Sequence, residues 1–245
     1  MAAGIQINEA SFGYTKNNRL IKVLQNINLA CSPGDFIGIA GVNGSGKSTL
    51  LKSLCGLLPL LEGNIVINGI PLSQITNNDL AKQISIVLTE KISGFNLTAF
   101  DAIAAGQLPY TNIFNRLEPA HLEVIQRAAE LCGIKDHLHK PLSELSDGLF
   151  QKTMIAKSIA QQTSILLLDE PTAFLDYASK HELFKLLGNL SSQNQKCVLV
   201  SSHDLDLILK YCNKVLLVKD SSAELLYTQS AYGHKIFTEL SGGYL

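Results

Sequence analysis

The first third of the chain carries a pattern of apolar and polar residues that predicts β-strands. Over residues 5–40, apolar positions partly alternate with polar ones, as expected for half-buried strands. Polar turns at residues 15–19 and 32–35 separate these strands. Residues 63–70 are typical of a hairpin with an Asn-Gly turn, and the β-branched run at residues 84–88 predicts a buried strand.

The spacing of apolar residues becomes helical between residues 89 and 162. One predicted helix begins at Pro119, because proline is favoured in the first turn. Its apolar face carries residues at helical spacing: Leu122, Ile125, Ala129 and Cys132. This part of the chain is therefore expected to form a helical subdomain.

Strands return after the helical stretch and alternate with helices. Apolar runs at residues 165–168, 197–201 and 215–218 predict strands, and residues 183–190 and 204–211 between them predict helices. Strands that alternate with helices favour a parallel sheet covered on both faces. The pattern as a whole predicts an α/β fold.

A glycine-rich loop of the form G-x-x-x-x-G-K-[ST] follows the apolar run at residues 36–40 and precedes a helical run. This strand–loop–helix context is the one that the motif requires, which argues against a simple turn. Glycines allow backbone turns whose N–H groups surround a phosphate chain. We expect Lys47 to reach the β- and γ-phosphates and the Ser48 hydroxyl to hold Mg²⁺. The predicted phosphate-binding residues are Gly41, Asn43, Gly44, Ser45, Gly46, Lys47, Ser48 and Thr49.

Three polar residues follow two of the predicted strands directly. Asp169 stands at the carboxyl end of the strand at residues 165–168, where α/β sheets place ligands, and is predicted to orient Mg²⁺ and its waters. Glu170 is then placed to activate an attacking water as general base. His203 follows the next strand and is predicted to contact the γ-phosphate. Acids at strand ends also occur as helix caps, but the glycine loop in the same chain favours the catalytic interpretation.

Ser146 and Gly148 open a predicted helix and form a candidate second anion site. One nucleotide does not need two such sites from one subunit. The Ser146 site is therefore expected to close on the nucleotide of a second subunit, with an ordinary capped helix as the alternative. Residues 173–176, which end on Asp176, come directly after the two acids and are a candidate subunit contact.

Composition and charge limit the classes of partner that the chain is expected to bind. The chain has 245 residues and a net charge of −1, which argues against a strongly basic, nucleic-acid-binding surface. No apolar run approaches the roughly 18 residues of a membrane span, and the first residues lack the pattern of a signal peptide. The five cysteines are scattered without a C-x-x-C pair, so free thiols in a reducing compartment are expected and a metal site is not.

In order and spacing, these motifs resemble those of nucleotide-binding subunits of ATP-binding cassette (ABC) transporters. The resemblance extends over about residues 5–220. It identifies residues 41–49 as the Walker A motif and residues 165–169 as the Walker B motif. Residues 145–149 are similar to the signature motif, and residues 173–176 to the D-loop.

The resemblance also implies roles for single residues. Glu170 matches the catalytic glutamate, and His203 matches the switch histidine. Tyr14 is either a rim residue of the N-terminal sheet or an aromatic that stacks on adenine, and the resemblance favours stacking. The implied ligands are ATP and Mg²⁺. Two copies of the chain would enclose two ATP molecules, each between the glycine loop of one copy and the signature of the other, so that Lys47 serves efficient hydrolysis only in the closed dimer.

Further partners follow from the same resemblance. The chain would bind transmembrane permease subunits, and through them serve a substrate-binding protein. It would lie in the cytoplasm, peripheral to the inner face of the cell membrane. The transported substrate is not encoded in this chain, because specificity lies in the permease and the binding protein.

Three positions depart from the family pattern. Thr89 stands where a glutamine usually helps to hold Mg²⁺, and losing one such contact costs about 1–3 kcal/mol. Thr89 is nevertheless a predicted contact to the metal and the nucleotide. The signature reads LSDGL instead of LSGGQ, so Asp147 is expected to turn outward and leave Ser146 and the Gly148 N–H to bind. Phe174 replaces a small polar residue of the D-loop.

Residues 104–110 resemble a Gly-Arg-x-Pro segment of importer subunits for iron–siderophore, heme and cobalamin, with Gln107 in place of the arginine. Together with the single-domain length, this favours an ATPase that powers import of a metal chelate. A soluble, non-transport ABC ATPase of the iron–sulfur assembly type, an export ATPase and a catalytically inactive binding module stay open as alternatives.

The expected fold is a P-loop NTPase core with a mainly parallel sheet, an antiparallel β subdomain and an inserted helical subdomain. Residues 1–245 would form one ABC ATPase domain. Residues 1–88 and 163–220 would form the core with the β subdomain, and residues 89–162 the helical subdomain with the signature loop. Residues 221–245 would be a short C-terminal tail.

Overall fold

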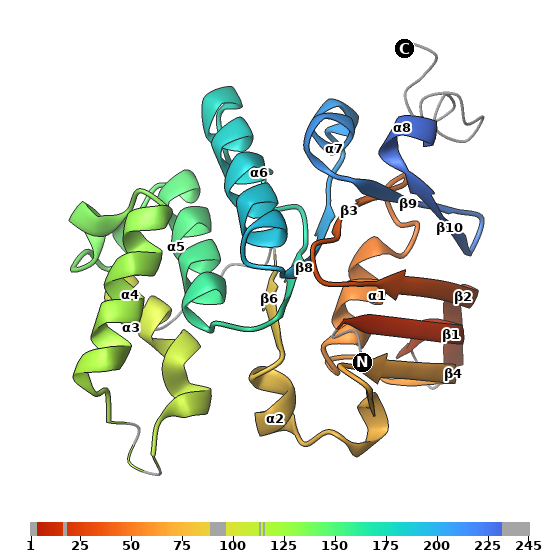
Figure 1. Cartoon of the computed structure of the whole chain (residues 1–245), viewed down its shortest axis with the longest axis horizontal. Coiled ribbons are helices and arrows are strands. Elements are labelled where there is room, and N and C mark those ends of the chain that lie inside the picture. Colours follow the sequence, from red (N-terminus) through yellow and green to blue (C-terminus); the bar gives the residue numbers. More distant parts are fainter. Residues whose placement is uncertain (1–3, 17–18, 89–96, 113, 115, 232–245) are drawn as a thin grey trace.

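The computed structural model describes residues 4–16, 19–88, 97–112, 114 and 116–231. These residues form two sheets and a set of helices arranged around them (Figure 1). The elements carry the labels of Figure 1 throughout.

The smaller sheet is antiparallel and has the order β2-β1-β4-β5. Its strands are β1 (Ile5–Lys16), β2 (Arg19–Cys31), β4 (Leu60–Ile67) and β5 (Ile70–Pro71). Between β4 and β5, Asn68 and Gly69 have φ values of 49° and 86°. Positive φ at both central residues is what a two-residue hairpin turn of type I′ requires, so the predicted Asn-Gly hairpin is confirmed.

The larger sheet has the order β10-β9-β3-β8-β7-β6. Its strands are β3 (Phe36–Ala40), β6 (Ile84–Val87), β7 (Ile165–Leu168), β8 (Cys197–Ser201), β9 (Lys214–Lys219) and β10 (Ser222–Tyr227). All neighbours pair in parallel except β10, which pairs antiparallel with β9. The mainly parallel sheet is therefore confirmed. Strand β10 comes from the region expected to be a tail and extends this sheet.

Helices cover the larger sheet and build the inserted subdomain. The α-helices are α1 (Lys47–Leu54), α2 (Asn77–Ala81), α3 (Ala99–Ala104), α4 (Pro119–Leu131), α5 (Asp147–Ala160), α6 (Tyr177–Ser192), α7 (Leu205–Tyr211) and α8 (Thr228–Ala231). Short 3₁₀ helices span Leu72–Gln74, Ala105–Tyr110, Lys135–His137 and Leu142–Glu144. Helices α3, α4 and α5 pack together as the predicted helical subdomain (Figure 1).

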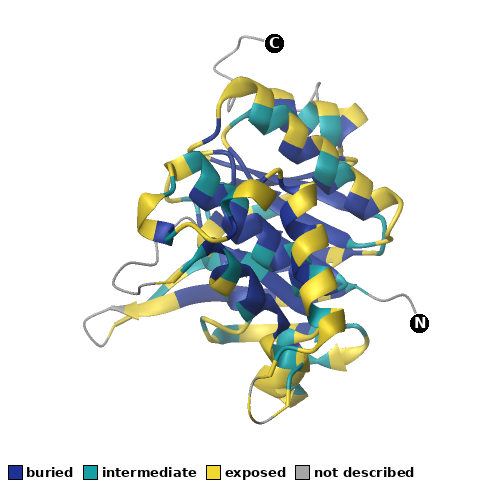
Figure 2. Cartoon of the chain, turned by 90° about the vertical axis from the view of Figure 1, so that its left-hand side faces the viewer, coloured by how far each residue is buried: buried dark blue, intermediate teal, exposed yellow. Residues whose placement is uncertain are grey.

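Two hydrophobic cores lie on the two faces of the larger sheet. In β7, Leu166 and Leu168 belong to the core shared with the helical subdomain and α6, while Ile165 and Leu167 belong to the core shared with α1 and the smaller sheet. This division follows from the alternation of side chains along a strand. A strand buried on both faces is mostly apolar, which explains the continuous apolar runs. Figure 2 shows buried residues gathered in the strands and exposed ones on the outer helix faces.

Cys31 and Cys197 form a disulfide, so the expectation that all five cysteines are free thiols is wrong. The pair is 166 residues apart in sequence, but the end of β2 lies beside the start of β8 and the Cα atoms are 6.2 Å apart. Cys55, Cys132 and Cys212 are free, as expected. Burial raises the pKa of the Cys132 thiol to about 12, which suppresses its reactivity.

Within the described part of the chain, no helix combines the length and the apolar character needed to cross a lipid bilayer.

Candidate active site

The glycine loop connects the buried strand β3 to α1. Gly44 and Gly46 have φ values of 76° and 109°, which residues with a Cβ rarely adopt. At Gly41 a Cβ would come within 2.6 Å of the Val218 carbonyl oxygen. Gly46 is the N-cap of α1 and no side chain caps the helix, so the N–H groups of its first turn face the loop unshielded by a capping group. The loop is thus shaped to receive an anion at a helix N-terminus.

Lys47 lies in this loop with its ammonium group directed at the loop backbone. Its Nζ donates hydrogen bonds to the carbonyl oxygens of Gly41 at 2.8 Å and Val42 at 3.2 Å. Burial lowers the pKa of Lys47, while the nearby Glu170 and Asp169 carboxylates raise it. The neighbouring Ser45 hydroxyl is buried and has no hydrogen-bond partner among the described residues. An orphaned hydroxyl beside a cationic side chain fits a phosphate ligand.

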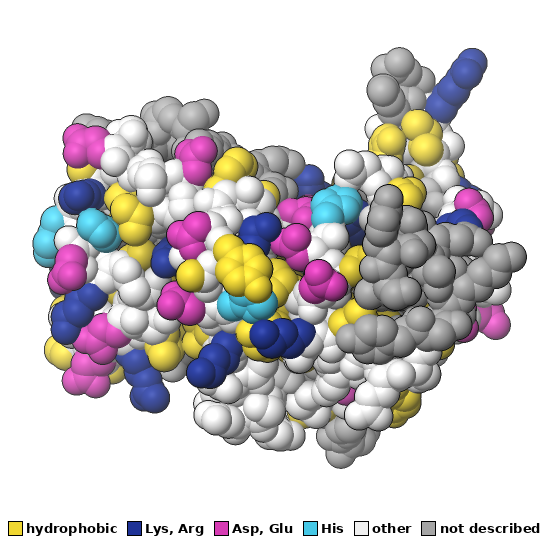
Figure 3. Space-filling model, turned by 90° about the horizontal axis from the view of Figure 1, so that it is seen from above, with side chains coloured by type: hydrophobic (Ala, Val, Ile, Leu, Met, Phe, Trp, Pro, Cys, Tyr) yellow, Lys and Arg dark blue, Asp and Glu magenta, His cyan; other side chains and the backbone are white. Residues whose placement is uncertain are grey.

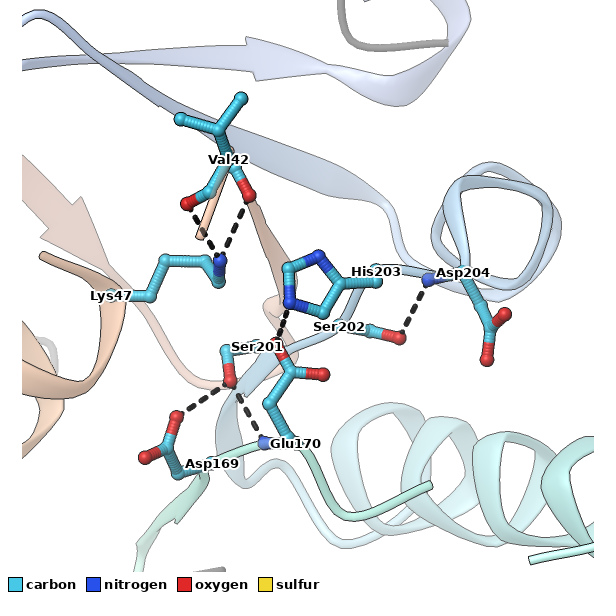
Figure 4. Close-up of polar contacts among 9 residues, drawn as sticks. Val42, Lys47, Asp169, Glu170, Ser201, Ser202, His203 and Asp204 are labelled. Carbon is cyan, nitrogen blue, oxygen red and sulfur yellow. Dashed lines mark hydrogen bonds and ion pairs between the residues drawn. The ribbon is translucent and has the colours of Figure 1, made fainter. Parts of the chain in front are cut away.

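The two acids stand beside this loop at the carboxyl end of β7. Asp169 is buried, and its backbone N–H donates to the Val87 carbonyl oxygen at 2.8 Å. Glu170 adopts a left-handed backbone with φ of 47°, a conformation that costs a non-glycine residue on the order of 1 kcal/mol or more. Strained backbone of this kind needs support from its surroundings. Figure 4 shows the acids, Lys47 and His203 around a common space.

Glu170 and His203 are paired across that space. The His203 Nε2 atom lies 3.2 Å from Glu170 Oε1 (Figure 4). Burial raises the pKa of Glu170, while His203 and Lys47 oppose the shift. The His203 side chain is 49% exposed and that of Glu170 20% exposed. A carboxylate made more basic by burial, with a partly exposed imidazole beside it, is suited to accept a proton from water.

The residues suited to hold Mg²⁺ are Ser48, in the first turn of α1, and Asp169. One hydroxyl and one carboxylate match the way proteins bind Mg²⁺ together with substrate phosphates and waters. Among the described residues there is no cluster of three or more His, Cys, Asp or Glu side chains that could hold a metal ion without a substrate. Thr89, the third predicted metal contact, lies outside the described residues.

The structure brings the signature and D-loop segments together. Ser146 is the N-cap of α5, and its Oγ accepts a hydrogen bond from the Leu149 N–H at 3.3 Å. A Cβ at Gly148 would meet the Phe174 carbonyl oxygen at 3.3 Å, so the two segments touch. Asp176 caps α6 by accepting from the Ser179 N–H at 2.8 Å, which lowers the pKa of its carboxyl.

Both segments lie on one exposed side of the molecule. In a fold with parallel strands, helices run opposite to the strands, so their first turns gather at the carboxyl edge of the sheet. Figure 3 views the molecule from this side, where acidic, basic and histidine side chains lie among hydrophobic ones. Two of the exposed hydrophobic residues, Phe174 and Tyr177, flank Asp176 closely in sequence.

A hollow beside the glycine loop is lined both by predicted phosphate-binding residues and by residues that the sequence did not point to. It is lined by Val23, Val42, Asn43, Gly44, Ser45, Val218, Lys219, Asp220 and Ser221. Tyr14 is exposed on β1 and is not among these lining residues. Stacking of Tyr14 on adenine therefore stays a prediction. Val23 on β2 lies behind the loop, where a Cβ at Gly46 would meet its side chain at 2.7 Å, and no pattern in the sequence indicates this contact.

The fold and the site define a P-loop nucleoside triphosphatase. A sequence model of the ABC transporter family matches residues 24–173, which is more than half of the chain. The chain belongs to the ABC transporter family and is an ATP-binding subunit of this kind. The family, the fold class and the ATPase activity expected from the sequence are confirmed.

Relatives and solved structures agree with this assignment. An uncharacterized ABC transporter ATP-binding protein of Methanocaldococcus jannaschii is 37% identical over 219 residues, or 89% of this chain and 76% of that protein. The iron(3+)-hydroxamate import ATP-binding protein of Bacillus subtilis is 29% identical over 80% of this chain and 73% of its own length. A metal-chelate type ABC transporter in an inward-facing conformation superposes with a TM-score of 0.83 at 25% identity, covering 98% of this chain and 89% of that one.

Proposed function

We propose that this chain hydrolyses ATP to power import of an iron-chelate, heme or cobalamin-type substrate through a separate permease. The observation that carries the importer class is the likeness to an iron-hydroxamate import protein and to a metal-chelate transporter over most of the chain. Gln107, the side chain that replaces the arginine of the importer segment, is buried and donates to the Ala160 carbonyl oxygen, so it anchors this segment to α5.

The glycine loop binds the phosphate chain in this proposal. The N–H groups of the loop and of the first turn of α1 donate to phosphate oxygens, and the Lys47 ammonium neutralises charge on the β- and γ-phosphates. Tyr14 stacks on the adenine ring. Ser48 and Asp169, with Thr89 as a further predicted contact, would hold Mg²⁺, which would supply charge neutralisation at the reacting phosphate.

Glu170 and His203 carry out the proton chemistry. Glu170 takes a proton from the attacking water, whose oxygen bonds to the γ-phosphorus while the bond to the bridging oxygen of ADP breaks. Its raised pKa makes Glu170 a stronger base than an exposed carboxylate. His203, which lies 3.2 Å from Glu170, orients the water and contacts the γ-phosphate.

A second copy of the chain completes each site. Ser146 and the Gly148 N–H of one copy close on the phosphates held by the other, and Asp176 contacts the opposite subunit. ATP binding closes this dimer and hydrolysis reopens it. The helical subdomain passes the motion to the permease, which holds the chain at the inner face of the membrane and receives substrate from a binding protein.

The importer assignment is tested by transport in sealed proteoliposomes. The chain is reconstituted with candidate permeases from the same organism, and uptake of labelled ferric hydroxamate, heme or cobalamin is measured with ATP on the side of the ATPase. We expect ATP-dependent movement toward that side, loss of transport with Glu170→Gln, and normal transport with Glu123→Gln, an exposed glutamate on α4. Movement in the opposite direction would identify an exporter, and failure to bind any permease would indicate a non-transport ATPase.

A further inference from the structure

The last residue of β8, Ser201, connects the two acids of the site through one hydroxyl. Its Oγ donates a hydrogen bond to Asp169 Oδ1 at 2.8 Å. The same oxygen accepts a hydrogen bond from the Glu170 N–H, also at 2.8 Å. Figure 4 shows Ser201 between the two acidic residues. A serine hydroxyl has one donor and two acceptor positions, so it can make both bonds at once.

The buried position of Ser201 leaves its two hydrogen bonds little freedom to change. Ser201 is fully buried, and β8 lies between β3 and β7 in the sheet. Buried hydroxyls of this kind keep fixed partners, because water cannot replace a lost bond. Asp169 is also buried, and its carboxylate oxygen Oδ1 would lose its donor if the hydroxyl were removed.

The Glu170 backbone depends on the same hydroxyl. Its φ of 47° is one that residues with a side chain seldom adopt, and such conformations persist only where neighbouring groups hold them. The N–H of Glu170 is held by Ser201, and its carbonyl oxygen accepts from the Ala173 N–H at 3.2 Å. This conformation directs the Glu170 side chain toward His203.

We propose that Ser201 is a positioning residue that sets the Asp169 carboxylate and the Glu170 backbone together. The proposal rests on the roles assigned above to Asp169 in holding Mg²⁺ and to Glu170 as base. By engaging Oδ1, Ser201 fixes the plane of the Asp169 carboxylate and leaves Oδ2 to the metal and its waters. By holding the Glu170 N–H, it keeps the base aimed at the attacking water. Loss of one hydroxyl therefore disturbs metal binding and proton transfer at the same time.

The test replaces Ser201 and compares the result with a matched serine elsewhere in the sheet. Ser85 on β6 is also buried, and its hydroxyl bonds Ser158 Oγ at 2.7 Å and Thr163 Oγ1 at 3.0 Å without touching either acid. Ser85→Ala thus removes two buried hydroxyl bonds of the same kind. Ser201→Ala is the main variant, and Ser201→Cys keeps the volume with a weak donor and acceptor if the alanine variant folds poorly.

Two readouts are measured, and only one of them is activity. For Ser201→Ala we expect kcat to fall about 10- to 100-fold, as for loss of a hydrogen bond to a charged group. The second readout is the gain in ATP affinity that Mg²⁺ produces, measured by calorimetry in the Glu170→Gln background, where ATP is not consumed. That gain should shrink about 10-fold, while metal-free ATP affinity stays within about 2-fold because the loop and Lys47 are untouched. Ser85→Ala should leave both readouts within about 2-fold of the parent protein.

The outcomes separate this inference from the proposed function. If Glu170→Gln stops turnover but both Ser201 variants keep the parental kcat and magnesium effect, the inference about Ser201 is overturned and the proposed function stands. If Ser85→Ala and Ser201→Ala lose activity in proportion to their loss of thermal stability, Ser201 is only structural and the inference also fails. If Glu170→Gln turns over like the parent protein, the assignment of the base fails first.

Discussion

The two halves of the candidate site differ in how their polar groups are held. At the acids, Asp169 and Ser201 are buried and bonded to each other from the ends of β7 and β8, while the buried Lys47 donates to the backbone of its own loop. At the first turns of α5 and α6, Ser146 and Asp176 are exposed, and each side chain caps its own helix. The acids are held by bonds between strands, whereas the Ser146 and Asp176 side chains are held as caps of their own helices.

This difference indicates what each half can do in a single chain. The buried half has its lysine, acids and histidine around one space, so it can bind a nucleotide without help. The exposed half offers the starts of two helices, and in the proposed function it acts on a nucleotide that a second copy holds.

The largest effect is expected from replacing Glu170, the proposed general base. Glu170→Gln should lower turnover by about 10²- to 10⁴-fold, the usual contribution of a general base. ATP binding should persist, because the glutamine leaves the glycine loop intact, and the variant should accumulate as a dimer with ATP. Phosphate release and light scattering with and without ATP measure both effects. Turnover at the parental rate would remove Glu170 from the mechanism.

The exposed half is tested by a matched pair at Ser146. Aspartate and asparagine cap helices as well as serine does, so both variants should fold normally. A carboxylate about 5 Å from a phosphate charge costs about 3 kcal/mol at an effective dielectric of 20. Ser146→Asp should therefore lower turnover about 100-fold by opposing dimer closure, while Ser146→Asn should stay within about 10-fold. Equal activities in the two variants would mean that Ser146 does not face a nucleotide.

Burial of the Glu170 carboxyl group costs folding free energy, and thermal denaturation should reveal this cost. Burial raises the pKa of Glu170 in the folded protein, so the charged carboxylate disfavours folding once the pH exceeds its unfolded pKa. Glu170→Gln should raise Tm at pH 7–8 by about 2–4 °C, the shift that about 1 kcal/mol gives at this size. Below about pH 3.5, where glutamate is mostly protonated in both states, the difference should vanish. A variant that melts below the parent protein at pH 8 would contradict the sign.

The smallest effect is expected at Asp147. Its side chain is exposed in the first turn of α5, where a negative charge suits the helix dipole. Asp147→Asn should change turnover by less than about 3-fold, since the carboxylate would be turned away from the phosphates. Steady-state assays at two salt concentrations measure this directly. A gain near 100-fold would show that the carboxylate faces the nucleotide and opposes closure.

Much of the fold and of the glycine loop could be predicted because local sequence determines them. The spacing of Gly41, Gly44 and Gly46 reflects backbone angles and close contacts that only glycine allows, and the structure shows both. The continuous apolar runs at β7 and β8 reflect burial on two faces. Such features need no knowledge of distant parts of the chain.

Features that join distant segments could not be predicted in this way. The role inferred for Ser201 depends on the left-handed backbone of Glu170 and on the pairing of β7 with β8. The disulfide depends on β2 ending beside β8, which no cysteine spacing reveals. Val23 reaches the hollow beside the loop only because β2 packs behind Gly46. In each case the sequence shows which residues are present, but not which residues the fold places beside them.

The connection between β6 and β7 has a consequence for the architecture of the helical subdomain. These two strands are parallel neighbours. After β6, the chain must therefore return to the edge of the sheet where the strands begin, and α5 makes that return. The stretch before α5 closes on itself: Thr98 pairs with Pro141, and the Leu142 N–H donates to the Leu97 carbonyl oxygen at 2.8 Å. The ends of residues 98–141 therefore adjoin, and we expect that this stretch can be exchanged as a unit between related proteins. Helix α5, with Ser146 at its start, lies outside this stretch.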